Sequence, residues 1–176
     1  MEIYIDNDLL LRTLVEDDAS TLFALVDGNR KYLREWLPWL DVNLEVNDSL
    51  SFIRHHKTSA TRPEDQPLGI LHQSNLCGVI GYDWVKDKSC SLGYWIAEEA
   101  QGKGIATRAS GALIGHAFSE MNLDTVEIHV AEGNLQSRSV AERLGLTLSH
   151  RKENAEQLYG RYIDHIVYVK SKDDPS

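Results

Sequence analysis

The stretch Cys90–Phe118, which reads CSLGYWIAEEAQGKGIATRASGALIGHAF, decides the fold of this chain. Its first residues alternate between apolar and polar types, which is the period of a strand with one buried face. A glycine-rich turn follows, and from Ala106 onward apolar residues recur at helical spacing through Leu113 and Ala117. The stretch therefore predicts a strand, a glycine turn and a helix in direct succession.

The glycine turn has the features of an anion-binding site. A helix leaves its first N–H groups without partners at the positive end of its dipole, and Gly102 and Gly104 have no Cβ to keep an anion away. A Rossmann fingerprint is excluded because it needs a third glycine where the chain has Thr107. A P-loop is excluded because Gly104–Ala106 does not read Gly-Lys-Ser/Thr. A glycine turn that merely joins a strand to a helix is the plain alternative.

The composition is that of an ordinary globular protein, with 42% hydrophobic and 26% charged residues in a chain of 176. We expect a single domain over residues 1–171 and a polar tail over residues 172–176. The formal net charge of −9 argues against direct binding of nucleic acid and suits a basic or amine-bearing substrate.

The cysteines and the N-terminus indicate the compartment. Cys77 and Cys90 lie in strand-like runs without metal-ligand spacing, so we expect buried thiols, no metal and a reducing environment. The first residues lack the basic and apolar regions of a signal peptide, and no apolar run reaches membrane length. We therefore expect a cytoplasmic protein that makes no use of a membrane.

Periodicity and turn residues predict the other elements. Strands are expected over Ile3–Ile5, Leu9–Leu14, Leu68–Gln73, Leu76–Val85, Cys90–Ala97, Thr125–Ala131, Leu146–Lys152 and Tyr162–Lys170. Helices are expected over Ala19–Val26, Arg30–Leu37, Ser49–Ser59, the stretch from Ala106, and Leu135–Leu144. Glu16–Asp18 should cap the first helix and Asn47 or Asp48 the third. Thr61–Gln66 and Glu153–Arg161 are expected to be loops.

Three residues of the turn carry a resemblance to a known family. Gln101, Gly104 and Ala106 match the Gln/Arg-x-x-Gly-x-Gly/Ala signature of the GCN5-related N-acetyltransferases, and the order of elements resembles that family along nearly the whole chain. The resemblance implies a single-domain α/β fold, an αβα sandwich with a mixed, mostly antiparallel sheet of about seven strands and helices on both faces. It also implies acetyl-CoA as cosubstrate, with its pyrophosphate held by Gln101, Gly102, Lys103, Gly104, Ile105, Ala106 and Thr107. We call residues 101–107 the cradle.

The resemblance further implies a V-shaped cleft for the pantetheine arm, where two neighbouring strands splay apart. Trp95 and Ile96 stand at the end of the first of these strands, and the N–H of Ile96 would receive the oxyanion. Asn134 and Ser137 match the family's Asn-x-x-Ser spacing, so Asn134 would meet the pantetheine and Ser137 would face the sulfur. Taken alone, Asn134 is equally well explained as a helix N-cap.

The subgroup resembled most is the RimJ/RimL type of ribosomal-protein N-terminal acetyltransferases. It shares the EDDA helix start, the LREWLPWLD stretch and the LGYWI strand of this chain. Many family members donate a proton from a tyrosine where this chain has Ala141, so that role is not transferred. By resemblance Glu156 is the base and Ser137 the acid, with Glu153 or water as rival bases. Because a serine hydroxyl is a weak acid, we expect Ser137 to donate a hydrogen bond to the thiolate instead of a proton.

These features predict an acetyl-CoA-dependent N-acetyltransferase. The expected acceptor is a primary amine, above all the α-amine of a protein such as a ribosomal protein. A polyamine or antibiotic amine is the alternative acceptor, and a non-catalytic acyl-CoA sensor is the alternative class. The oligomeric state stays open, with a homodimer or another homo-oligomer as possible assemblies. Trp36 and Trp39 have two interpretations, as core packing or as a wall of the substrate site.

Overall fold

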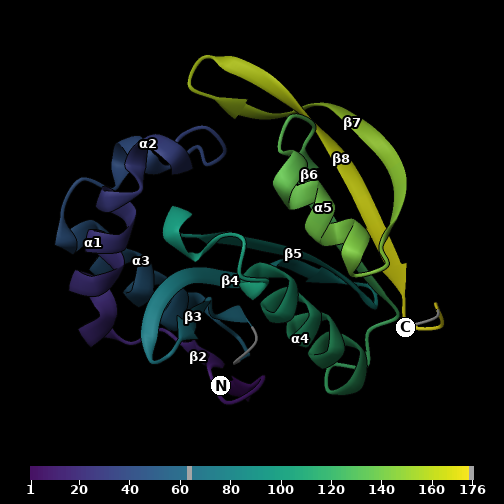
Figure 1. The fold of residues 1–176 in the computed structure, drawn as a ribbon, viewed down its shortest axis with the longest axis horizontal. Helices are drawn as coiled ribbons and strands as arrows, with labels where there is room; N and C mark the ends of the chain where they lie inside the picture. The colour runs from purple at the N-terminus through teal and green to yellow at the C-terminus, as the bar shows by residue number, and fades with distance from the viewer. Residues whose placement is uncertain (63–64, 175–176) are drawn as a thin grey trace. The chain divides into compact units, whose positions relative to one another are not determined.

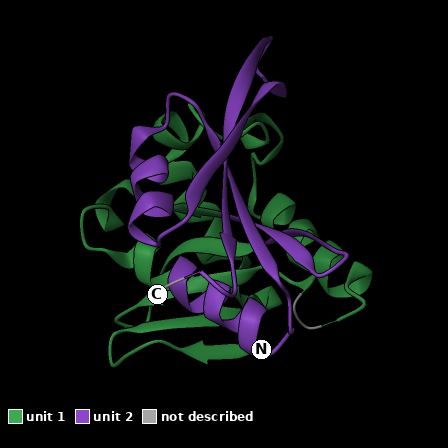
Figure 2. Cartoon of the chain, turned by 90° about the vertical axis from the view of Figure 1, so that its right-hand side faces the viewer, with its two compact units in different colours: residues 1–81, 94–109 green, residues 82–93, 110–176 purple. Residues whose placement is uncertain are grey.

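The structure is a computed structural model that describes residues 1–62 and 65–174. The chain divides into two compact units (Figure 2): unit 1 is Met1–Gly81 with Tyr94–Ala109, and unit 2 is Tyr82–Gly93 with Ser110–Ser176. Residues 63–64 of the expected loop and 175–176 of the expected tail lie outside the described residues.

Unit 1 contains a run of antiparallel strands. These strands are β1 (Glu2–Tyr4), β2 (Leu9–Thr13), β3 (Leu68–His72) and the first part of β4 (Asn75–Lys86). Leu11 pairs with Ile70, and both side chains are fully buried. Gln73 and Ser74 both have positive φ and form the two-residue turn of the β3–β4 hairpin, so β3 ends one residue before the expected strand Leu68–Gln73.

Three helices pack in unit 1. They are α1 (Ala19–Gly28), α2 (Arg30–Leu33) and α3 (Val46–Ser59). Leu22 of α1 and Ile53 of α3 share a buried cluster with Val79 of β4, so the apolar stripes of α1 and α3 close one core (Figure 1).

The helix starts in unit 1 differ from the prediction. Short 3₁₀ turns cover Glu16–Asp18 before α1 and Leu40–Val42 after α2. Asp18 does not cap α1 with its side chain; its carboxylate instead accepts the N–H of Val15 at 2.8 Å. The helix α3 starts at Val46, three residues before the predicted start, because the carboxylate of Asp48 accepts N–H groups from the preceding turn. The helix α2 ends at Leu33 rather than at Leu37.

Unit 2 contains the remaining strand pairs. Its strands are the end of β4, the start of β5 (Ser89–Ile96), β6 (Thr125–Ala131), β7 (Thr147–Leu158) and β8 (Arg161–Ser171). The β5–β6 pair is parallel, whereas β6–β8 and β7–β8 are antiparallel. The hydrogen-bonded order is β1-β2-β3-β4-β5-β6-β8-β7, a mixed and mostly antiparallel sheet with eight strands in the described part of the chain rather than about seven.

Two helices follow the glycine turn and β6. They are α4 (Ile105–Ser119), which starts in unit 1 and continues in unit 2, and α5 (Leu135–Arg143). Tyr168 of β8 is almost fully buried and fixes α5, because its hydroxyl accepts from Arg138 and donates to Glu142. Gly145 has a φ of +75° and follows Leu144 directly, in the left-handed position that commonly ends a helix.

The prediction of a loop over Glu153–Arg161 is wrong, because most of this segment is strand. Strands β7 and β8 form a long hairpin that turns at Tyr159–Gly160 (Figure 1). β7 is the last strand in the sheet order, and its first eight residues are exposed on both faces. An edge strand of this kind lacks the alternation of buried apolar residues on which strand prediction depends.

Candidate active site

The cradle has an unusual backbone. A short turn at Glu98–Ala100 leads into Gln101, after which Gly102 and Gly104 both have a φ of +70°. The first helical bond of α4 runs from the N–H of Arg108 to the carbonyl of Gly104 at 3.0 Å. The N–H groups of Ile105 and Ala106 come before this bond and thus have no acceptor within the helix.

The space in front of the two glycines is open. A Cβ built on Gly102 or Gly104 meets no atom of the described residues within 4 Å, and a side chain at either position would be strained by the positive φ. Lys103 between them is exposed, whereas Ile105 and Ala106 bury their side chains and fix the start of α4. The arrangement fits an anionic group that approaches the backbone closely.

An ion-pair network fixes the first turn of α4 to the β1–β2 turn. Nη1 of Arg108 donates to a carboxylate oxygen of Asp6 at 2.6 Å and of Asp8 at 2.8 Å. The backbone N–H of Asp8 and, to a lesser extent, Arg108 lower the pKa of Asp6 to about 2. Sequence reasoning missed this network because it joins residues about a hundred positions apart.

The end of β5 lies close against β4 within unit 1. A Cβ on Gly78 would lie 2.3 Å from the carbonyl oxygen of Trp95, so only glycine allows this approach. The N–H of Ala97 donates to the carbonyl of Cys77 at 2.8 Å. The backbone at Trp95 and Ile96, the predicted oxyanion position, is therefore held by its neighbours. Cys77 and Cys90 are buried, as expected.

The tryptophans of the LREWLPWLD stretch are half-buried in unit 1. The ring of Trp39 lies 6.2 Å from the ring of Trp95 at an interplanar angle of 55°. Trp95 in turn packs on the cluster formed by α1, α3 and β4. Trp39 is therefore an aromatic packing partner of the strand end that carries Ile96.

A cavity of about 690 Å³ opens beside this region in unit 1. It is lined by the α1 residues Thr21, Ala24, Leu25 and Gly28, by Asn29, and by Glu98 and Glu99. Both glutamates are exposed, and the described residues of this lining include two carboxylates and no basic side chain. The lining therefore favours a cationic or neutral ligand over an anionic one.

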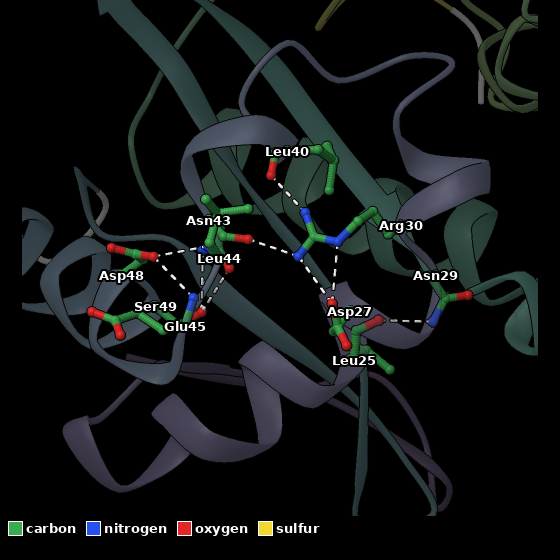
Figure 3. Close-up of polar contacts among 10 residues, drawn as sticks. All are labelled: Leu25, Asp27, Asn29, Arg30, Leu40, Asn43, Leu44, Glu45, Asp48 and Ser49. Carbon is green, nitrogen blue, oxygen red and sulfur yellow. Dashed lines mark hydrogen bonds and ion pairs between the residues drawn. The ribbon is translucent and has the colours of Figure 1, made fainter.

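Asn29 joins the two sides of this cavity. Sequence reasoning missed this role of Asn29. Its Oδ1 accepts the N–H of Glu98 at 2.9 Å. Its Nδ2 donates to the carbonyl of Leu25 at 2.8 Å (Figure 3). The amide of one side chain thus fixes the turn that leads into the cradle to the end of α1.

Arg30 is a second residue that sequence reasoning missed. Its guanidinium donates to the carbonyl of Leu40 at 2.6 Å and to that of Asn43 at 2.7 Å, and it also pairs with Asp27 (Figure 3). These bonds hold the segment that carries Trp39. No periodicity in the sequence signals a side chain that binds backbone carbonyls.

Asn134 and Ser137 lie at the start of α5 in unit 2. Oδ1 of Asn134 accepts the N–H of Ser137 at 3.1 Å, so Asn134 is an N-cap, as the alternative interpretation proposed. This bond uses the amide oxygen and leaves the amide NH₂ as the group that would meet a ligand. Ala141, at the position of the family tyrosine, is completely buried.

Glu156 and Glu153 have different surroundings on β7. Glu153 is paired with Arg151 at 3.4 Å, and its side chain is 76% exposed. Glu156 has an exposed side-chain fraction of 30%, and its Oε2 lies 3.5 Å from Nε2 of His165. The structure places Glu156 on a strand, not in the loop expected before the last strand.

Asp83 of β4 is a third carboxylate in unit 2, and sequence reasoning missed it. A Cβ on Gly93 would lie 2.5 Å from the Asp83 carboxylate, which Ser91 also approaches with its hydroxyl at 3.3 Å. Desolvation by the surrounding atoms raises the pKa of Asp83, and the negative charge of Glu156 raises it further.

The predicted site residues thus fall into two groups. Trp95, Ile96 and the cradle belong to unit 1, whereas Asn134, Ser137 and Glu156 belong to unit 2. No group of His, Cys, Asp and Glu among the described residues is arranged to hold a metal ion. No helix in the described part of the chain is long and apolar enough to span a membrane.

A mixed sheet with an open glycine cradle at a helix N-terminus has the features of a protein that binds a phosphate-bearing ligand. A family model described as an acetyltransferase (GNAT) domain matches residues 8–147, so the chain belongs to this family.

Relatives match almost the whole chain. YdaF of Bacillus subtilis (strain 168) is 32% identical over 169 residues, which cover 93% of this chain and 91% of YdaF. The ribosomal-protein-serine acetyltransferase of Escherichia coli (strain K12) is 28% identical over 170 residues, 96% of this chain and 95% of that protein. The structure is similar to RimL, a ribosomal L7/L12 alpha-N-protein acetyltransferase in complex with coenzyme A. The TM-score is 0.92 at 26% identity, covering 98% of this chain and 99% of that one.

The protein is accordingly an acetyl-CoA-dependent N-acetyltransferase with the GNAT fold. The family expected from the cradle signature and the order of elements is confirmed.

Proposed function

We propose that this enzyme acetylates the N-terminal α-amine of a protein, with a ribosomal protein as the leading acceptor. The observation that carries acetyl transfer is the open cradle at the start of α4. The choice of acceptor is supported by likeness to a ribosomal-protein-serine acetyltransferase over 96% of the chain. A ribosomal acceptor would be met in the cytoplasm. A homodimer or other homo-oligomer stays a prediction.

The cradle would hold the pyrophosphate of acetyl-CoA. Residues 101–107 offer backbone N–H groups at the positive end of the α4 dipole, with Lys103 as an exposed counter-charge. The amide NH₂ of Asn134 would meet the pantetheine arm. The thioester supplies the activated acetyl group, and the side chains of the protein orient it and move protons.

Glu156 is the proposed base. Glu156 removes a proton from the acceptor ammonium, and the neutral amine then attacks the thioester carbonyl carbon. The N–H of Ile96 stabilises the oxyanion that forms. As the intermediate collapses, the carbon–sulfur bond breaks, the nitrogen releases its second proton to water, and the departing thiolate takes up a proton from water. Ser137 donates a hydrogen bond to the departing thiolate.

The cavity beside α1 supports an acceptor with neutral or basic residues near its amine. Glu98 and Glu99 give it a negative edge, and its volume of about 690 Å³ lies within the usual range for ligand sites. The same charge suits a polyamine or an aminoglycoside, which is the alternative acceptor class.

The test of this function is acetylation of a peptide library varied at its first two residues, with spermidine and aminoglycosides alongside. The proposal predicts that peptides with a free α-amine are preferred and that N-terminally blocked peptides are inert. Faster turnover of spermidine or an aminoglycoside than of every peptide would move the function to small amines. Binding of acetyl-CoA without any turnover would indicate a sensor.

A further inference from the structure

The hairpin β7–β8 contains a bulge that positions Glu156. Lys152 pairs with His165 and Glu156 with Ile163, so β7 advances four residues while β8 advances two. Two extra residues are therefore accommodated between Lys152 and Glu156, with Asn154 at a φ of +48°. Bulges of this kind re-aim side chains, often next to active sites.

The bulge is pinned by the residue next to His165. The N–H of Asn154 donates to Oδ1 of Asp164 at 2.7 Å, and Arg151 pairs with the same carboxylate. This arrangement places the carboxylate of Glu156 3.5 Å from Nε2 of His165, on the same face of the hairpin. The separation is long for a hydrogen bond but short enough for strong electrostatic coupling.

We propose that His165 takes from Glu156 the proton that Glu156 removes from the acceptor amine, and passes it to solvent. The inference rests on the proposed function, because it assumes that Glu156 is the base. Imidazole suits this role because histidine exchanges protons readily near neutral pH. The His165 side chain is 16% exposed, which gives the proton a way out to water.

The step balances without a further reactant. The amine N–H bond breaks as an O–H bond forms on Glu156, and that O–H bond breaks as an N–H bond forms on Nε2 of His165. The imidazolium then releases the proton to water. The imidazole must therefore start each cycle with its proton on Nδ1 and with Nε2 free to accept.

The charged groups around His165 come from several strands of unit 2. From β7 it faces Glu156 and its register partner Lys152, and from β6 its partner is Ala131. Further along β6, His129 pairs with Glu127 at 2.7 Å. Asp83 of β4 interacts electrostatically with both Glu156 and His129. Among the groups named around His165, carboxylates are therefore more numerous than ammonium groups, of which Lys152 supplies one.

The relay is tested by replacing His165 and adding imidazole. His165→Ala should lower kcat about tenfold at neutral pH, less than the loss of a general base itself, with the KM for acetyl-CoA unchanged. Added imidazole should restore most of the rate, since it can enter the space and accept the proton. His165→Gln should lose rate similarly and show no rescue, because its side chain fills that space.

The matched control is His72→Ala in unit 1. His72 pairs with Asp8 at 3.2 Å and is 20% exposed, so it resembles His165 in burial and in having a carboxylate partner, and that partner is not Glu156. This variant should keep its kcat and show no response to imidazole. Melting temperatures of all the variants exclude unfolding as the cause.

Two outcomes separate the relay from the proposed function. A His165→Ala enzyme with normal kcat, or one that imidazole does not restore, overturns the relay if Glu156→Gln is still impaired. Normal activity in Glu156→Gln overturns the proposed base, and the relay with it.

Discussion

Glu156 and Glu153 stand three positions apart on β7, yet only one has surroundings that suit a base. Glu153 is paired with Arg151 on the exposed side of the strand, so its carboxylate is already engaged by a cation. Glu156 faces His165 and Asp83, with no arginine among its recorded partners in the described residues.

Glu156→Gln should therefore lower kcat/KM by roughly 10²-fold at neutral pH, the usual scale for one general base. The deficit should shrink at high pH, because an α-amine with a pKa of about 8 then deprotonates unaided. Rates measured from pH 6 to pH 9.5 check this.

Two variants act as controls for Glu156. Glu153→Gln should stay near wild type. Ser137→Ala should lose rate equally at every pH, because a hydrogen bond to a thiolate, about 1.5–3 kcal/mol, does not depend on the charge of the amine. An impaired Glu153→Gln beside a normal Glu156→Gln would move the base to Glu153.

At the scale of elements, the turn after α2 depends on Arg30. The guanidinium satisfies two backbone carbonyls that an ammonium cannot reach together. Arg30→Lys should therefore destabilise the protein by about 1–3 kcal/mol, the cost of unsatisfied polar groups. Urea unfolding measures this change.

Arg34→Lys is the matched control for Arg30. Arg34 follows α2 directly and pairs with Asp41 at the surface, with 45% of its side chain exposed. Exposed pairs contribute about 0–1 kcal/mol, so this variant should unfold near the wild-type midpoint. Equal losses in the two variants would refute the special role of the Arg30 bonds.

The contact between α4 and the β1–β2 turn should respond to acid. The pKa of Asp6 is about 2 in the folded protein and about 3.9 in an unfolded chain, so its contribution is present above pH 4 and lost as pH falls toward 2. The melting temperature of Asp6→Asn should therefore fall by less than that of wild type between pH 5 and pH 2.5.

Asp87→Asn, on the exposed β4–β5 turn, is the control for Asp6. Its decline in melting temperature over the same pH range should match that of wild type. A decline in Asp6→Asn as steep as in wild type would contradict the assignment.

The sequence predicted most elements because their local signals agree. Strict alternation of apolar and polar residues predicted the strand Thr125–Ala131 with its observed ends. The glycines of the cradle predicted the position of the turn before α4. The extension of β7 was missed because a bulge and an exposed edge erase the period of a strand. Arg30, Asn29 and Asp83 were missed because their partners depend on tertiary structure, which no spacing encodes.

At the scale of the whole molecule, the net charge of −9 should influence the choice of acceptor. The KM for a basic peptide should rise between 20 mM and 500 mM salt, since the Debye length falls from about 20 Å to about 4 Å. A neutral peptide with the same first residue is the control, and its KM should change little. Equal changes in KM for both peptides would show that the charge of the protein does not influence the choice of acceptor.

Binding of the cosubstrate at the cradle is the central claim, and coenzyme A tests it through thermal stability. At 100 times Kd the ligand should stabilise the wild-type fold by about 2.7 kcal/mol and raise its melting temperature. Gly104→Glu should abolish this shift, because its carboxylate enters the open space where the pyrophosphate would lie.

Gly160→Glu is the matched control, and it makes this comparison the most direct test. Gly160 also has a positive φ, +85°, and no described atom lies within 4 Å of a Cβ built on it, so Gly160→Glu brings the same backbone strain and charge at the β7–β8 turn. The account predicts a full coenzyme A shift in Gly160→Glu and none in Gly104→Glu. A full shift in Gly104→Glu would contradict it.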